Sequence, residues 1–507
     1  MSVFKKFAGQ TLIYGLSTII SRLLNFVLTP IFVRKFEAST YGIFTNMYSW
    51  AAMINAFLAF GMETTYFRYL QKVKDEDKSK VFNNSFVVTI FTSLIFLITI
   101  LLFSHDIAIW FAKENIDSIR EYKSYVYFVG LTLVVDALAV VPFAKVRANG
   151  RPMRYGVLKL VNIITFVVLN LTFIVFIPYL LKHFPAISSY FSSWYVDSWL
   201  GYVFISNFVA STLTLLMLLP EIRTFSFKVD KVLLGDMFRY SFPILIANIS
   251  YIINENLDKI MMPELLPKDI ADRDVGIYGA IAKIAVFLSI FVQAFRLGAE
   301  PFFFSYSKNE NSRQVYAVIM EYFVIAMMIV MIGLSVNIDW LKYFIQGGSP
   351  KESAEYWSGL FIIPVILFNY VMLGIYMNLS VWYKLSDQTR YGLYISGIGA
   401  LLTVFLCYIF IPQYSYVGAI FVTSVTYIVM VFLSYFWGQR NYPIPYKLFK
   451  IAAYMLVGVA IVYIHYTAFD RNFWIGNGLL LGYILGAAFV EKKTVMKMFG
   501  QKDRSDF

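Results

Sequence analysis

Long apolar segments follow one another along almost the whole chain, and this feature constrains the fold more than any other. A helix needs about 20 mostly apolar residues to cross the hydrocarbon core of a bilayer, and by that measure we expect about 14 spans. The connections between them are short, which indicates an all-α membrane protein without a folded domain outside the bilayer. The expected spans lie near residues 8–33, 41–66, 82–103, 122–144, 156–177, 199–219, 239–262, 276–303, 314–335, 356–382, 390–411, 416–438, 450–467 and 473–490.

The composition supports a membrane protein. Hydrophobic residues make up 59% of the chain and charged residues 15%, whereas soluble chains carry about 45–50% apolar and about 25% charged residues. The single cysteine, Cys407, excludes a disulfide framework, and the three histidines are far apart in sequence. Neither residue type has the spacing of a zinc site, so we expect no metal and no cofactor.

The positive charges predict orientation rather than nucleic-acid binding. The net charge is +12, but the basic residues lie mainly in the short connections. More than twice as many Lys and Arg residues fall on one predicted side as on the other. Because the richer side is normally cytoplasmic, we expect both termini in the cytoplasm.

Two spans share a weak sequence pattern that indicates an internal repeat. The second begins with Gly42-Ile43-Phe44 and the eighth with Gly276-Ile277-Tyr278. Six spans in each half give both halves the same orientation, as in parallel-repeat transporters. We therefore predict two pseudo-symmetric six-helix bundles, residues 1–220 and 221–440, followed by two helices and a cytoplasmic tail in residues 441–507.

Polar residues within spans are the candidate functional residues, because a charge at mid-bilayer costs at least about 2.5–3.5 kcal/mol. In the first span, Arg22 and Asn25 belong to one polar helical face. Guanidinium geometry suits phosphate, so Arg22 is a candidate cation for an anionic substrate. The alternative is an ion pair between Arg22 and a carboxylate of another helix. The candidate partners are Glu63, Asp136 and Glu255.

The seventh span carries Asn248, Glu255 and Lys259 on one face. Glu255 and Lys259 have the spacing of a local salt bridge. Alternatively, Glu255 carries a coupling proton or binds a cation.

The fourth and eighth spans contain the remaining candidates. In the eighth, Gln293, Arg296 and Glu300 share a stripe near the predicted cytoplasmic end, and Lys283 lies deeper. Arg296 and Glu300 can pair with each other as a gate, and Lys283 either adds to a cationic cavity or neutralises Glu255. Asp136, in the fourth span, either pairs with Arg22 or Lys283 or is an ion site.

Taken together, these features resemble the polysaccharide-transport branch of the MOP flippase superfamily, the O-antigen (Wzx-type) flippases related to MATE transporters. The matching segments are spread over most of the chain. They are the opening Gln10-Thr-Leu-Ile-Tyr-Gly with Arg22 and Pro30, Tyr41-Gly-Ile-Phe, the Arg147-to-Tyr155 loop, the Asn-rich seventh span ending in Asp258-Lys259, Gly276-Ile-Tyr-Gly, and Ala299-Glu-Pro-Phe-Phe-Phe-Ser305.

The resemblance implies a flippase of the bacterial cytoplasmic membrane, not an enzyme. It implies alternating access and an undecaprenyl-pyrophosphate-linked oligosaccharide as substrate, moved to the outer leaflet for surface polysaccharide synthesis. Arg22 then takes the role of the first-helix basic residue, and Lys283 and Arg296 that of further cavity cations. The partners are membrane lipid and this substrate, with no nucleic acid. The energy source is a proton or sodium gradient or consumption of the product outside, because the chain has no phosphate-binding GxxxxGK[ST] loop.

Three rival functions stay open at this point. A peptidoglycan-precursor flippase fits the span count nearly as well. A cation-coupled multidrug exporter of the same superfamily is favoured less, because the first span offers Arg22 and no acid. A membrane polymerase or glycosyltransferase needs a substantial outer loop or catalytic acids, and the longest predicted outer segment, 178–198, holds only Asp197.

Overall fold

The computed structural model describes residues 26–113, 118–184, 190–191, 193–307, 309–386 and 388–500, without the side chains of residues 297, 298, 300, 301, 305 and 493–500. Over these ranges the chain is helical and contains no β-strand. The expectation of an all-α fold is therefore confirmed for the described chain.

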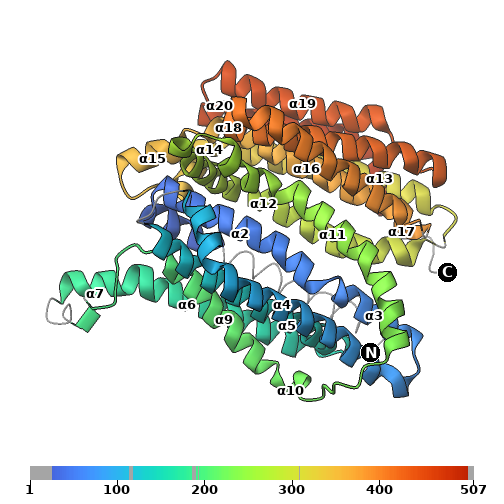
Figure 1. The fold of residues 1–507 in the computed structure, drawn as a ribbon. Helices are drawn as coiled ribbons and strands as arrows, with labels where there is room; N and C mark the ends of the chain where they lie inside the picture. The colour runs from blue at the N-terminus through green and yellow to red at the C-terminus, as the bar shows by residue number, and fades with distance from the viewer. Residues whose placement is uncertain are drawn as a thin grey trace. The chain divides into compact units, whose positions relative to one another are not determined.

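The first half of the chain folds into helices of varied length (Figure 1). They are α2 (Ala38–Ala59), α3 (Met62–Lys72), η1 (Asp75–Asp77), α4 (Lys78–Ala112), α5 (Ile119–Ala148), α6 (Pro152–Leu171), η3 (Thr172–Phe176), α7 (Ile177–His183), α9 (Gly201–Met217) and α10 (Leu219–Ile222).

The second half contains the longest helices. They are α11 (Lys231–Leu265), α12 (Lys268–Tyr306), α13 (Ser312–Val336), α14 (Ile338–Leu341), η4 (Lys342–Ile345), α15 (Pro350–Trp357), η5 (Leu360–Ile362), α16 (Ile363–Leu379), α17 (Val381–Leu385), α18 (Arg390–Asn441), α19 (Leu448–Thr467) and α20 (Phe473–Gly500).

Among the described residues, 10 helical segments are long and apolar enough to cross a membrane. Every expected span from 41–66 onward overlaps a helix, while most of the span 8–33 lies outside the described residues. The two expected spans 390–411 and 416–438 both fall within α18, whose backbone leaves helical geometry at Ser415, with φ 51° and ψ −134°. The total of about 14 spans stays a prediction.

The chain forms two compact units, which we describe separately. The first comprises Met1–Ala280, Gly347–Tyr356 and Gly392–Thr426, and the second comprises Ile281–Gln346, Trp357–Tyr391 and Tyr427–Phe507. These units are defined by packing alone. The predicted bundles 1–220 and 221–440 therefore stay a prediction about repeated halves.

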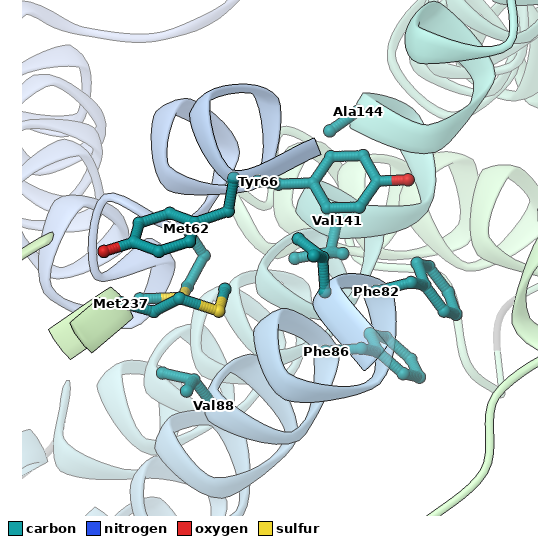
Figure 2. Close-up of a cluster of buried hydrophobic side chains, with 10 residues drawn as sticks. Met62, Tyr66, Phe82, Phe86, Val88, Val141, Ala144 and Met237 are labelled. Carbon is teal, nitrogen blue, oxygen red and sulfur yellow. The ribbon is translucent and has the colours of Figure 1, made fainter. Parts of the chain in front are cut away.

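In the first unit, α4 packs along α5, α5 packs against α9, and α9 packs against α6. Figure 2 shows a buried apolar cluster that joins α3, α4, α5 and α11. Met62, Val81 and Met237 are fully buried within it. Large apolar side chains stabilise by about 1.5–3 kcal/mol each when fully buried against protein rather than water. This cluster ties the start of α11 to the first helices.

A buried asparagine holds the connection that leads into α11. The Asn84 side chain on α4 donates to the Asp230 carbonyl at 2.9 Å and accepts from the Asp230 amide at 3.1 Å. Asp230 in turn caps α11 by accepting from the Leu233 amide at 3.1 Å. Because a buried amide left unsatisfied is costly, the fully buried Asn84 specifies where α11 begins.

In the second unit, α13 packs against α16, α19 and α20. A network of ion pairs links α19 and α20 to α13. Lys450 on α19 lies 2.8 Å from a carboxylate oxygen of Glu321 on α13 and 2.7 Å from one of Glu491 on α20. The two carboxylates are nearly fully buried, so Lys450 compensates part of their loss of hydration, and Lys447 adds a second ammonium 3.2 Å from Glu321.

Candidate functional site in the helical interior

Asp136, one of the predicted candidates, lies on α5 inside the first unit. Its half-buried carboxylate interacts electrostatically with the Lys159 ammonium on α6. Lys159 itself lies 4.5 Å from the centre of the Phe143 ring. A half-buried acid and a half-buried base compensate part of each other's loss of hydration. The charge of Lys159 therefore acts on Asp136, an interaction that the sequence had not predicted.

Further charges extend this pair toward the predicted cytoplasmic end of the first unit. Glu63 at the start of α3 forms a salt bridge with Arg147 near the end of α5. Both act electrostatically on Lys159. The Arg147 guanidinium also lies 5.0 Å from the centre of the Phe67 ring. Glu63, which the sequence offered as a partner of Arg22, thus pairs with Arg147.

The loop after α5 is held by a buried carboxylate on α10. Glu221 is almost fully buried and lies 2.8 Å from the Arg154 guanidinium and 4.0 Å from that of Arg151. The Lys145 ammonium donates to the Glu221 carbonyl at 3.1 Å. These basic residues stabilise the end of the bundle by satisfying Glu221, so we assign them a structural role.

On α11, the buried Asp258 carboxylate is surrounded by donors. It accepts from the Lys259 ammonium at 3.0 Å and from the Tyr278 hydroxyl at 2.5 Å. Lys259 also donates to the Glu255 carbonyl at 3.0 Å. The Lys259 carbonyl accepts from the Asn46 amide of α2 at 2.9 Å. The interaction network joins α2, α11 and α12 within the first unit.

Glu255 and Asn248 occupy different surroundings on α11. Glu255 is half-buried, and its carboxylate accepts from the Tyr251 hydroxyl at 2.9 Å. Asn248 is exposed. Asn254, directly before Glu255, accepts from the Thr403 hydroxyl of α18 at 3.3 Å, and the Thr403 hydroxyl lies 3.1 Å from that of Thr426. The polar residues of this helix are therefore divided between internal hydrogen bonds and exposed positions.

The remaining candidates on α12 belong to the second unit. Lys283 and Gln293 are half-buried and Arg296 is exposed. Arg296 lines a small cavity together with Asn378 of α16 and Lys384 of α17. Two cationic side chains and an amide thus meet at this position, which is an arrangement suited to an anion.

Three predicted candidates cannot be placed. Arg22 and Asn25 lie outside the described residues, and so does the side chain of Glu300. Within the described residues, no group of three or more His, Cys, Asp or Glu side chains is arranged to hold a metal ion.

Sequence reasoning missed Lys159, Asn378 and Lys384. Lys159 lies inside an expected span, so the sequence shows that its charge is costly there. The pattern of spans does not reveal which residue interacts with it. Lys384 looks like an ordinary topology signal at a span end. Asn378 is one polar residue in an apolar helix, and no sequence pattern distinguishes it.

Solved structures of similar fold come from two transporter families. "Lipid II flippase MurJ, inward closed conformation" has a TM-score of 0.68 and 13% identity, covering 96% of this chain and 100% of its own. The inward-facing form of a multidrug resistance MATE family transporter of the MOP superfamily has a TM-score of 0.65 and 13% identity, covering 83% and 94%. The Vibrio cholerae MATE transporter VcmN in its bent form has a TM-score of 0.52 and 12% identity. The match covers 86% of this chain and 96% of the VcmN chain.

At these identities the likeness shows the fold alone, a MOP-like transporter fold. No curated protein matches the chain. A family described as "Polysaccharide biosynthesis protein" matches residues 7–306, more than half of the chain. The protein therefore belongs to the polysaccharide biosynthesis protein family.

Proposed function

We propose that the protein is a flippase for an undecaprenyl-pyrophosphate-linked oligosaccharide. It moves this substrate from the inner to the outer leaflet of the bacterial cytoplasmic membrane by alternating access, for the synthesis of a surface polysaccharide. The observation that carries the proposal is the family match over residues 7–306. The MOP-like fold supplies a transporter architecture for it.

The anionic head group of such a substrate requires polar side chains within the helical units, and the structure contains them. A sugar diphosphate is anionic and strongly hydrated, and it cannot enter hydrocarbon without large loss of hydration energy. A transporter must therefore offer it charged and polar groups within the membrane. Asp136 with Lys159, and Arg296 with Lys384, are such groups inside the two units.

The roles that we propose follow from charge. Arg22, Lys283 and Arg296 bind the diphosphate. Asn25, Asn248 and Gln293 contribute hydrogen bonds to the head group. Asp136, Glu255 and Glu300 act in coupling to a proton or sodium gradient, since a carboxylate in the interior exchanges a cation more readily than it binds a diphosphate.

Genetic replacement tests this function. A bacterium that lacks its own O-antigen flippase loses surface glycan and accumulates the lipid-linked precursor. Expression of this protein should restore the glycan. An inserted, stable protein that restores nothing in hosts with several different glycans would contradict the proposal.

A peptidoglycan-precursor flippase is the second candidate, because the fold of the lipid II flippase is matched over 100% of that chain. Depletion of the host's own lipid II flippase separates the two functions. Growth rescued by this protein would favour lipid II, whereas restored surface glycan without rescued growth would favour the oligosaccharide.

A cation-coupled multidrug exporter is the third. The half-buried Asp136 is the observation that favours it, since a carboxylate in the first bundle suits a cation. Drug resistance in a host that lacks its own exporters would support this function, and surface glycan synthesis would then be unchanged.

A further inference from the structure

A small cavity in the second unit has the chemistry of a phosphate site. Its polar lining consists of the Arg296, Lys384 and Asn378 side chains, which come from α12, α17 and α16. None of the described residues that line it is acidic. Its volume is about 10 Å³, which leaves space for about one water-sized group. A single phosphate oxygen, presented by a group outside the cavity, fits such a space.

Asn378 is a second, independent observation that points to a ligand with an acceptor atom. Its side chain is only 6% exposed. Among the described residues, no hydrogen-bond acceptor reaches its buried Nδ2 atom. Buried amide donors without an acceptor cost about 1–3 kcal/mol and are rare in native proteins. An anion held between Arg296 and Lys384 would supply the acceptor that this donor lacks.

An apolar cavity lies next to the small one. It has a volume of about 580 Å³ and is bounded by α12 and α13. Its wall includes Phe302, Val318, Ile319 and Phe323, and Phe295 lines both cavities. An almost wholly apolar cavity of this size suits a hydrocarbon chain. The shared Phe295 ring places the chain-binding wall directly beside the phosphate-binding groups.

We propose that these two cavities form one binding site for a single-chain lipid phosphate of the polyprenyl type. The phosphate enters between Arg296, Lys384 and Asn378, and the isoprene units nearest the phosphate occupy the apolar cavity, with the rest of the chain in the surrounding lipid. A polyprenyl phosphate fits because its phosphate is attached directly to the chain. In a glycerophospholipid a glycerol unit separates the phosphate from the two chains, so we expect such a lipid to bind more weakly. The inference rests on the proposed function, which provides a polyprenyl diphosphate carrier.

Native mass spectrometry of the full-length purified protein tests the site. Undecaprenyl phosphate and phosphatidylglycerol are titrated separately against the wild type, and against Arg296→Gln and Asn378→Leu. We expect the wild type to retain undecaprenyl phosphate in preference to phosphatidylglycerol. Each variant should weaken its retention by about tenfold or more, as expected for loss of a hydrogen bond to a charged group. Ala326→Trp, which fills the apolar cavity, should weaken it as well.

The matched control is Arg390→Gln, which removes an exposed arginine of the second unit that does not line either cavity. It should bind undecaprenyl phosphate like the wild type. If Asn378→Leu does not fold, Asn378→Ala and Lys384→Gln provide the same comparison, with the thermal unfolding temperature as the folding readout.

Two outcomes would overturn the site. Either all variants retain undecaprenyl phosphate as the wild type does, or the wild type retains phosphatidylglycerol equally well. Both leave the proposed transport function standing, because surface-glycan export by the same variants is measured separately in cells. Failure of the wild type to restore any glycan would instead contradict the transport function, whatever the binding result.

Discussion

Gly42 on α2 and Gly276 on α12 pack against each other's helices in a reciprocal manner. A Cβ atom on Gly42 would lie 1.7 Å from the carbonyl oxygen of Asp272, and one on Gly276 would lie 1.7 Å from that of Ala38. Each of these carbonyls belongs to the residue four positions before the opposite glycine. The two helix starts therefore cross with local two-fold symmetry and with backbone directly against backbone.

This crossing predicts a strong effect of a single methyl group. In Gly42→Ala or Gly276→Ala, the helices must separate, because a backbone carbonyl cannot move aside as a side chain does. Overpacking of this kind costs about 1–3 kcal/mol or more, so we expect a lower unfolding temperature in detergent and reduced glycan export.

Gly235 on α11 provides the matched control, since a Cβ atom there meets nothing within 4 Å. Gly235→Ala should leave the unfolding temperature unchanged or raise it, because alanine favours a helix over glycine by up to about 1 kcal/mol. Equal unfolding temperatures for Gly42→Ala, Gly276→Ala and Gly235→Ala would show that the crossing is not tightly packed.

The ion network of the second unit predicts that Lys450 stabilises the attachment of α19 and α20 to α13. Lys450→Met leaves the Glu321 and Glu491 side chains, which are 2% and 6% exposed, without this partner. Removing one member of a buried ion pair costs about 3–5 kcal/mol. Because Lys450 is partly exposed, we expect a loss of stability near the lower end of this range. Thermal unfolding of the purified protein measures this loss.

Lys492→Met is the control, because Lys492 lies next to Glu491 but is exposed. It should unfold like the wild type. The double variant Lys450→Met with Glu491→Gln should recover part of the loss, and no recovery would mean that Lys450 acts through packing rather than through its charge.

The Asp136–Lys159 pair predicts a separation of stability from transport. Asp136→Asn and Lys159→Gln each leave one interior charge uncompensated, so each should lower both stability and export. The double variant removes both charges, and we expect its unfolding temperature to return toward that of the wild type. If the pair takes part in transport, export stays low in the double variant. Full export there would make the pair purely structural.

Arg22→Ala tests the proposed recognition of the diphosphate. If Arg22 binds the substrate, export of surface glycan should be lost while the amount of protein in the membrane is unchanged. Arg34→Ala, the loss of an exposed arginine at the end of the same segment, should export normally. Normal export by Arg22→Ala would remove Arg22 from the substrate site.

Local patterns in the sequence predicted a large part of the fold for physical reasons. Hydropathy marks spans because an apolar helix of sufficient length is stable only in lipid or in a protein core, and each later span overlaps a helix. The shared Gly-Ile-aromatic pattern indicated two related segments. That Gly42 and Gly276 meet each other depends on packing between distant segments, which no local pattern contains.

The partners of charged residues were the least predictable part. A sequence shows that Asp136 is costly inside a span, but the approach of Lys159 depends on how α6 lies against α5. Likewise, the Lys259 ammonium donates to the Asp258 carboxylate and to the Glu255 carbonyl, and the spacing of Glu255 and Lys259 predicts neither contact. Asn378 is informative only once its unsatisfied donor is seen beside Arg296.

The most direct test of the central claim is a leaflet assay with purified protein in liposomes. An undecaprenyl-pyrophosphate-linked oligosaccharide is placed in both leaflets, and a glycosidase outside reports how much of it becomes accessible. The account predicts that the wild-type protein moves substrate from the inner to the outer leaflet, so that more than half of the total substrate is cleaved. It predicts that with Arg22→Ala the substrate of the inner leaflet stays protected. Protection of the inner pool by the wild type, under both proton and sodium gradients, would contradict the account.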